Sequence, residues 1–254
     1  MEKPKLFFGL KRSKISHDEK ILSFSYQKVD MPLKFSLKNN VKQIFNQGDI
    51  NSCSANAVGN QLLMSDNKNL IQFIPSRMYI YFNSRFIDND KQMPLTDSGA
   101  SLKSVYQAIS TYKFTSEDIY PYEIQNVNRI PPKNVYDQAI YKTIQPIESY
   151  RRINPCIYSF KYILNVLKLP IMFGMSVYEI FIDLNRENDL LYEPMGEFLG
   201  LHAVVIVGYD DQNQCFDILN SHGVEFGNDG FFRMSYKYIM NIDLCFEFYV
   251  INSS

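Results

Sequence analysis

Helical patterns fill the first half of this chain, and short strand-like runs fill most of the second half. Apolar residues at helical spacing, or turn signals typical of helix ends, predict helices over 52–66, 75–86, 102–112 and 159–167. Apolar or β-rich runs broken by Gly, Asn and Asp predict strands over 171–178, 202–209, 215–220, 230–234 and 245–251. Helices followed by strands favour an α+β protein with a helical lobe and an antiparallel sheet lobe.

Two segments lack this patterning. Residues 1–30 are rich in lysine and carry one short apolar cluster, Leu6-Phe7-Phe8. They are expected to form an N-terminal arm packed on the surface or, alternatively, a short pro-segment that covers an active site. Residues 122–152 are polar, contain Pro131-Pro132, and are predicted to connect the two lobes. The expected domain is therefore 31–254, with a helical lobe over about 45–125 and a β lobe over about 145–254.

One predicted helix mixes apolar residues with arginines. In residues 75–86, Pro75 suits a helix start, and Met78, Ile80 and Phe82 alternate irregularly with Arg77 and Arg85. This pattern predicts a helix that is only half buried.

Size and charge exclude several classes of function. A chain of 254 residues and 29.7 kDa can bury a large core or two small lobes around a cleft. The net charge of −1, with scattered Lys and Arg, gives no basis for binding nucleic acid. No apolar run is long enough to span a membrane, and the cluster at 6–8 is too short for a signal peptide. We therefore expect an intracellular monomer without membrane contact. The abundance of Asn, Ile, Lys, Tyr and Phe resembles AT-biased genomes such as those of giant viruses or protists, and a viral source would make the virion an alternative location.

Cysteine and histidine are scarce. The four cysteines form no CxxC pair, and the chain has three histidines, so no metal or other cofactor is expected. Cys156, Cys215 and Cys245 are predicted to be small buried hydrophobic residues, with a Cys215–Cys245 disulfide as the alternative.

The fourth cysteine lies in the stretch QGDINSCSANA, residues 47–57. Ser52 is a good N-cap for the helix that follows, which would place Cys53 in its first turn. Unpaired backbone N–H groups and the helix dipole favour an anion there. The thiol of Cys53 is therefore expected to ionise easily and to act as a nucleophile.

Cysteine catalysis also needs a base, a group that orients the base, and donors for an oxyanion. His202 begins an apolar run after Gly200, and Asn220 ends the run CFDILN. Gln47 offers a side-chain amide near the backbone N–H of Cys53. Taken singly, His202 is more typical of a core histidine, Asn220 of a turn residue, and Gln47 is uninformative. Their joint order is specific.

These residues resemble the papain-like cysteine peptidases, of the papain and cathepsin family, from about Met31 to the C-terminus. The matching stretches are FNQGDINSCSANA (45–57), DSGAS (97–101), YPYE (120–123), LHAVVIVGYDD (201–211) and NSHGVEFGNDGFF (220–232). The resemblance implies a papain-like two-lobe fold with a helical left lobe, an antiparallel β-sheet or barrel right lobe, and the active site in the cleft. It also implies Cys53 as nucleophile, His202 as general base and acid, Asn220 as its orienter, and Gln47 as oxyanion donor.

The chain departs from the family near the site. Ile50 stands where the family has a disulfide cysteine, which agrees with a reducing compartment. Ser54 replaces an aromatic residue, and His222 and Phe226 replace two tryptophans, of which the first shields the bond between the asparagine and the histidine. That bond is therefore expected to be wetter here, and His222 is alternatively a second titrating group. The pattern resembles the bacterial-type branch, with Ser-Cys-x-Ala-Asn-Ala, more than the lysosomal enzymes.

Substrate recognition follows from the same resemblance. Gly99 and Ala100 align with the glycine pair that hydrogen-bonds an extended substrate backbone. Gly174, Gly200 and Ala203 would line the pocket for the residue two before the scissile bond, leaving room for a bulky apolar side chain. The adjacent histidine pair of the cathepsin B occluding loop has no counterpart, which favours an endopeptidase.

Three functions are consistent with these residues. The first is a cysteine endopeptidase acting on protein or peptide substrates, kept latent by residues 1–30. The second is a papain-fold binding protein with weakened catalysis, motivated by Ser54 and His222. The third is another acyl-transfer enzyme of the amidase or transglutaminase-like kind, which an asparagine rather than an aspartate at position 220 disfavours.

Overall fold

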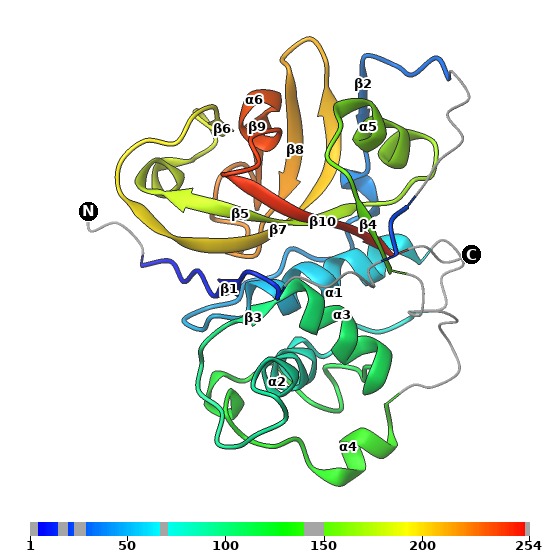
Figure 1. The fold of residues 1–254 in the computed structure, drawn as a ribbon, viewed down its shortest axis with the longest axis vertical. Helices are drawn as coiled ribbons and strands as arrows, with labels where there is room; N and C mark the ends of the chain where they lie inside the picture. Colours follow the sequence, from blue (N-terminus) through cyan, green and yellow to red (C-terminus); the bar gives the residue numbers. More distant parts are fainter. Residues whose placement is uncertain (1–4, 15–19, 23–28, 67–70, 140–149, 252–254) are drawn as a thin grey trace.

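The protein has a helical lobe and a sheet lobe that meet along one long helix (Figure 1). This is seen in a computed structural model that describes residues 5–14, 20–22, 29–66, 71–139 and 150–251. The helices of the first lobe are α1 (Cys53–Ser65), α2 (Arg77–Asp88), α3 (Leu102–Thr111), η2 (Ile124–Asn126) and α4 (Lys133–Asp137). The helices on or beside the sheet are η1 (Lys38–Asn40), α5 (Ile157–Asn165), η4 (Glu179–Asp183) and α6 (Tyr236–Ile239). The predicted helices are therefore present, with ends that shift by one or two residues.

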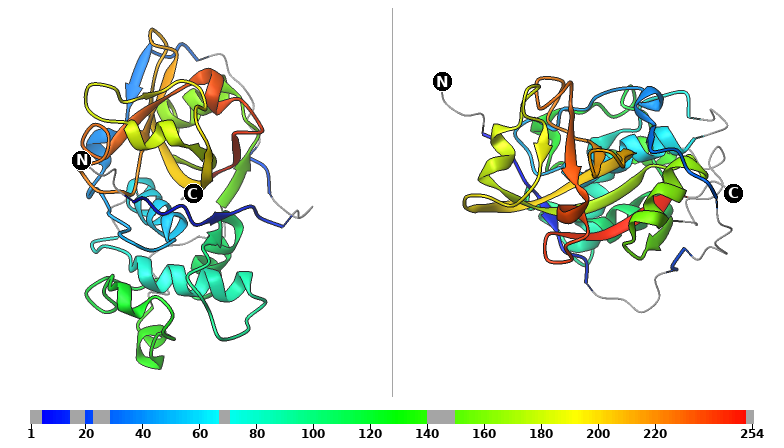
Figure 2. Two further views of the ribbon diagram at one scale, coloured as in Figure 1. Left: turned by 90° about the vertical axis from the view of Figure 1, so that its left-hand side faces the viewer. Right: turned by 90° about the horizontal axis from the view of Figure 1, so that it is seen from above.

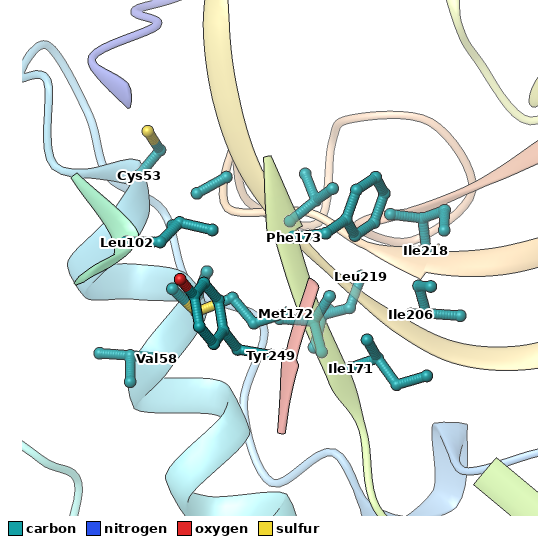
Figure 3. Packing of buried hydrophobic residues seen from close by; sticks show 14 of the residues in the cluster. Cys53, Val58, Leu102, Ile171, Met172, Phe173, Ile206, Ile218, Leu219 and Tyr249 are labelled. Carbon is teal, nitrogen blue, oxygen red and sulfur yellow. The ribbon is translucent and has the colours of Figure 1, made fainter. Parts of the chain in front are cut away.

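Helix α1 joins the two lobes. Every residue from Cys53 to Ser65 is buried, and Ala55, Ala57 and Gly59 are small enough to permit close packing on both sides. Figure 3 shows Val58 of α1 beside Met172 and Tyr249 of the sheet, within one continuous apolar cluster. The only long polar side chain in this helix, Gln61, donates through Nε2 to the Tyr249 carbonyl at 2.9 Å. This packing fixes the start of α1, and with it Cys53, against the sheet.

Helix α2 is more buried than its sequence predicts. Residues 77–85 are all buried, so the prediction of a half-buried helix was wrong. At the first residue of the helix, Arg77, burial is possible because the guanidinium lies over the rings of Phe45 and Tyr122. Its Nε also donates to Glu117 at 2.6 Å. A paired and stacked arginine can be buried where an isolated charge cannot. The helix starts at Arg77 rather than Pro75, and the Ser76 side chain caps it by accepting from the backbone N–H of Tyr79.

The sheet lobe contains eight strands in the order β4-β10-β5-β7-β8-β9-β6, with β2 paired to β7 off this path. Their bounds are β2 (Lys34–Ser36), β4 (Tyr150–Ile153), β5 (Ile171–Tyr178), β6 (Leu190–Leu191), β7 (Phe198–Asp210), β8 (Cys215–Leu219), β9 (Phe231–Ser235) and β10 (Cys245–Ile251). All pairs are antiparallel except β6 with β9. The α+β class with an antiparallel sheet lobe is confirmed.

The N-terminal arm, here residues 5–14 and 20–22, contacts both lobes. Its strand β1 (Leu10–Lys11) pairs in parallel with β3 (Ala100–Ser101) of the helical lobe, while Gly9 bridges to Leu201 of β7. Figures 1 and 2 show this dark blue segment running between the sheet and the helices. Further along, Ile21 bridges to Arg152 of β4. Residues 1–4, 15–19 and 23–28 of the predicted arm, and residues 140–149 of the predicted connection, lie outside the described residues.

Two further predictions concern the cysteines and the membrane. All four cysteines are free thiols; Cys215 and Cys245 are buried as predicted, but Cys156 is exposed because it precedes α5 at the surface. Within the described ranges, none of the helices is long and apolar enough to cross a lipid bilayer.

Candidate active site

Cys53 is the first residue of α1 and is fully buried. Figure 3 shows its sulfur directed away from Val58 and the rest of the helix. Ser52 precedes it at the N-cap position, but its side chain bonds the Tyr122 hydroxyl and so does not cap the helix. The predicted capping by Ser52 was therefore wrong.

The thiol of Cys53 is harder to ionise than expected. Backbone N–H groups of Gly9, Ser54 and Ala203 face the sulfur and favour the thiolate. Burial acts in the opposite direction and is larger, raising the pKa of Cys53 to about 11. The expectation of easy ionisation is therefore wrong for this form of the chain, in which Gly9 of the arm is part of the surroundings that exclude water.

His202 lies in β7 and Asn220 directly after β8, and the structure brings them together. The Oδ1 atom of Asn220 lies 2.7 Å from Nε2 of His202, and both residues are buried. The other ring nitrogen, Nδ1, has no hydrogen-bond partner among the described residues. Burial lowers the pKa of His202 to about 4, although the bond to Asn220 favours the charged ring. The peptide group between His202 and Ala203 faces the Cys53 sulfur, so the imidazole is attached beside the thiol.

The bond between His202 and Asn220 is shielded, contrary to the expectation that it would be wet. Phe8 of the arm and Phe181 of η4 each pack edge-on against the His202 ring, with centroids 5.5 and 5.9 Å away. His222 stacks on the same ring and so occupies the shielding position itself.

Gln47 is oriented by the same loop that carries Asn220. Its Oε1 accepts from the Ser221 hydroxyl at 2.8 Å, which fixes the direction of the carboxamide. Its Nε2 donates to the Ile50 carbonyl at 2.9 Å and to the Phe7 carbonyl of the arm at 3.1 Å. A peptide carbonyl therefore already lies against the predicted oxyanion donor.

Four of the five predicted substrate-binding residues lie against the arm, and the fifth, Ala203, pairs with one of them. Ala100 donates its N–H to the Gly9 carbonyl at 3.1 Å. A Cβ on Gly174 would lie 2.7 Å from Leu10, and one on Gly200 would lie 3.0 Å from Phe8. Gly99 has φ +76, and a Cβ there would meet the Gly9 carbonyl oxygen at 1.6 Å. Ala203 is paired with Gly174 in the β5–β7 register.

Sequence reasoning missed the residues that hold the two cleft loops together. The carboxylate of Asp97 accepts from the backbone N–H of Asn51 at 3.1 Å and from the Tyr81 hydroxyl at 2.5 Å. The same hydroxyl accepts from the Gly99 N–H at 3.0 Å. Asp97 therefore ties the loop before Cys53 to the loop that carries Gly99. Its place two residues before Gly99 was the available signal.

Comparison with known proteins identifies the family. The sequence profile of the papain family cysteine proteases matches residues 28–245. The chain belongs to this family. It is therefore a cysteine-type peptidase, a hydrolase that acts on proteins, as its sequence predicted.

Relatives of this protease occur in viruses and bacteria. It is 30% identical over 217 residues to an uncharacterized peptidase C1-like protein of Acanthamoeba polyphaga mimivirus, covering 81% of this chain and 68% of that protein. It is 28% identical to xylellain, a cysteine protease from Xylella fastidiosa, with a TM-score of 0.83 over 100% of this chain and 98% of that one.

Procathepsins share the fold at lower identity. Digestive procathepsin L2 of the Tenebrio molitor larval midgut is 19% identical, with a TM-score of 0.73 over 96% of this chain and 77% of that one. The papain-like two-lobe fold of the protease is thereby confirmed.

Proposed function

We propose that the protease is an endopeptidase in which Cys53 is the nucleophile and His202 the general base and acid. The proton of the thiol passes to Nδ1 of His202, and the sulfur attacks the carbonyl carbon of the scissile peptide. The bond from Asn220 Oδ1 to Nε2 supports this assignment, because it keeps the proton of the neutral ring on Nε2 and leaves Nδ1 as the acceptor.

The remaining steps use Gln47 and a water molecule. The carbonyl oxygen becomes an oxyanion that accepts from Nε2 of Gln47 and from the backbone N–H of Cys53. The imidazolium then gives its proton to the amine as the C–N bond breaks, which leaves an acyl group on the sulfur. Water, deprotonated by His202, attacks that acyl carbon and releases the second product with the free thiol.

The arm is proposed to keep this site latent. Its Phe7 carbonyl accepts from Gln47, its Gly9 carbonyl accepts from Ala100, and its Leu10 side chain lies against Gly174. Leu10 therefore takes the pocket assigned to the residue two before the scissile bond, while Phe7 offers a carbonyl to the oxyanion donor. In a substrate the pocket residue precedes the scissile carbonyl, but in the arm it follows. The reversed direction explains how the arm fills the cleft without presenting a bond for cleavage.

The proposal of a latent peptidase rests on one observation, the hydrogen bond from Gln47 Nε2 to the Phe7 carbonyl. It is tested by labelling with the thiol-directed epoxide E-64, followed by intact-mass measurement. A chain that begins at Met31 is expected to gain one inhibitor per molecule rapidly, the full chain slowly, and the full chain with Cys53→Ala not at all. Labelling of the Cys53→Ala chain would refute Cys53 as the nucleophile. Equal labelling rates for the full chain and the chain that begins at Met31 would refute latency.

A peptide-library assay separates the kinds of peptidase and acyl-transfer chemistry. Cleavage at internal bonds, read by mass spectrometry, is expected of an endopeptidase. Absence of cleavage with intact E-64 labelling would favour the binding protein with weakened catalysis. Deamidated or cross-linked products would favour the amidase or transglutaminase-like alternative.

A further inference from the structure

His222 lies in the loop after β8, two residues beyond Asn220. The loop is fixed: the Gly223 N–H donates to the Phe45 carbonyl at 2.9 Å, and His222 forms a β-bridge with Asn46. Its ring is stacked on that of His202, with centroids 4.9 Å apart and planes 15° from parallel. The chain has three histidines, and two of them form this buried pair.

One carboxamide connects the two rings. Asn220 Oδ1 lies 2.7 Å from His202 Nε2, and Asn220 Nδ2 lies 3.0 Å from His222 Nδ1. A carboxamide has one accepting end and one donating end. Because Nδ2 donates, Nδ1 of His222 has to be unprotonated; because Oδ1 accepts, Nε2 of His202 has to carry its proton. The state of His222 therefore determines which end of Asn220 faces His202.

We infer that His222 is a positioning residue, which through Asn220 keeps His202 in the tautomer that can take the proton of Cys53. This inference rests on the proposed roles of Cys53 and His202. It explains why a ring with an accepting nitrogen stands at a position where a purely apolar ring would shield equally well.

Protonation of His222 reverses the arrangement. A proton on Nδ1 would face the Nδ2 donor of Asn220, so the carboxamide would turn and present Nδ2 to His202. Nε2 of His202 would then have to accept, and its proton would move to Nδ1, where it blocks transfer from the thiol. The neutral form of His222 and the competent form of His202 are thereby coupled.

The surroundings of His222 favour its neutral form. His202 of β7 is the titratable group that acts on it, and its charge lowers the pKa of His222. Phe8 of the arm, Phe181 of η4 and Phe226 of the following loop present their rings to it, so burial lowers the same pKa further, to about 3. The Phe7 carbonyl acts in the opposite direction and favours the protonated ring.

The kinetic test uses two variants that separate the accepting atom from the ring. His222→Asn places an oxygen where Nδ1 stood and cannot be protonated near neutral pH, whereas His222→Phe keeps a ring without an acceptor. Both are made in the full chain carrying Gly9→Ala, which is expected to lift the arm. At neutral pH, kcat is expected to be retained in His222→Asn, because the side-chain oxygen of the new residue still accepts from Asn220 Nδ2. In His222→Phe, kcat is expected to fall about tenfold with KM unchanged, as for a buried donor left without its acceptor.

A role in packing alone predicts the opposite order. His222→Phe would then retain the parent kcat, and His222→Asn, which loses the ring, would be the weaker enzyme. That order would overturn the inference.

A second measurement does not depend on catalysis. Ring nitrogen shifts from long-range ¹⁵N NMR report the tautomer of each histidine in the full chain with Cys53→Ala. His202 is expected as the Nε2–H tautomer there and with His222→Asn added, but as a mixture with His222→Phe added. An unchanged tautomer with His222→Phe would overturn the inference even if Cys53 is the nucleophile. If instead the catalytic roles are wrong, the kinetic effects disappear while the tautomer change remains.

Discussion

The sharpest test of arm-mediated latency is one methyl group on Gly9. A Cβ at Gly9 would lie 2.1 Å from Cβ, 2.3 Å from the carbonyl oxygen and 2.6 Å from Cα of Asn51. None of these atoms belongs to a flexible side-chain end, and Asn51 is held by Asp97 through both its backbone N–H and its Nδ2. Gly9→Ala therefore forces the arm away from the loop before Cys53.

The size of the effect follows from the cost of overpacking, about 1–3 kcal/mol. Applied to the equilibrium between a seated and a lifted arm, that cost raises the lifted population about 5- to 150-fold. The rate of E-64 labelling of the full chain at low inhibitor concentration is expected to rise by the same factor. The control is Lys11→Ala in the same arm, which removes only an exposed bond from Nζ to the Ser98 hydroxyl.

Two results would refute this reasoning. A folded Gly9→Ala chain that labels at the native rate would show that the arm does not limit access to Cys53. An equal acceleration by Lys11→Ala would show that the arm is so weakly held that the close contact at Gly9 is irrelevant.

Other predictions concern catalysis, pH and stability. Gln47→Ala in a chain that begins at Met31 should lower kcat for peptide hydrolysis by about 10²–10³ with little change in KM, as for other oxyanion donors, and an unchanged kcat would exclude Gln47 from that role. Burial holds the pKa of His202 at about 4 and that of His222 at about 3, below the usual value near 6.5, so unfolding takes up protons at acid pH. The contribution of these two neutral rings to the free energy of unfolding should accordingly be fully present above pH 6.5 and should fall by about 2 kcal/mol per ring at pH 5. Urea melts that show no loss of stability between pH 7 and 5 would contradict this. Arg77→Ala, which leaves Glu117 without its partner, should cost about 3–5 kcal/mol in urea melts, whereas Lys133→Ala in the exposed pair with Asp137 should cost less than about 0.5 kcal/mol.

The sequence predicts the interior strands better than the edge strands. The bounds of β5 and β10 match the predicted runs to the residue, because strands buried on both faces read as continuous apolar stretches. The edge strand β4 has the sequence YRRI and β2 has KFS, so neither differs from a polar loop. Such strands form because a neighbour offers free hydrogen-bonding groups, which no local pattern records.

For the candidate site too, some features could be predicted from the sequence and others could not. Gln47, Cys53, His202 and Asn220 were predicted from their order and spacing. The structure places them close together: Asn220 bonds His202, the adjacent Ser221 bonds Gln47, and the Ala203 backbone faces the Cys53 sulfur. The path of the arm was left between two alternatives, because it depends on contacts between Gly9 and residues more than forty positions away. The raised pKa of Cys53 was missed for the same reason: its position in the helix favours ionisation, but the burial that opposes it comes from distant segments.

The arm, when it lies in the site, is expected to disfavour the ion pair of Cys53 and His202, and that ion pair to disfavour the arm. With Gly9 against Cys53 and Phe8 against His202, burial raises the pKa of the thiol and lowers that of the imidazole, so both groups are neutral at pH 7. Proton transfer from Cys53 to His202 would create two charges in a fully buried site, which is unfavourable while the arm remains. Release of the arm is expected to hydrate both groups and to remove this cost. Because the coupling is reciprocal, formation of the ion pair must weaken the binding of the arm by the same free energy with which the arm suppresses the ion pair. In the proposed latent form, the arm would therefore oppose catalysis twice, by filling the substrate path and by keeping the sulfur protonated.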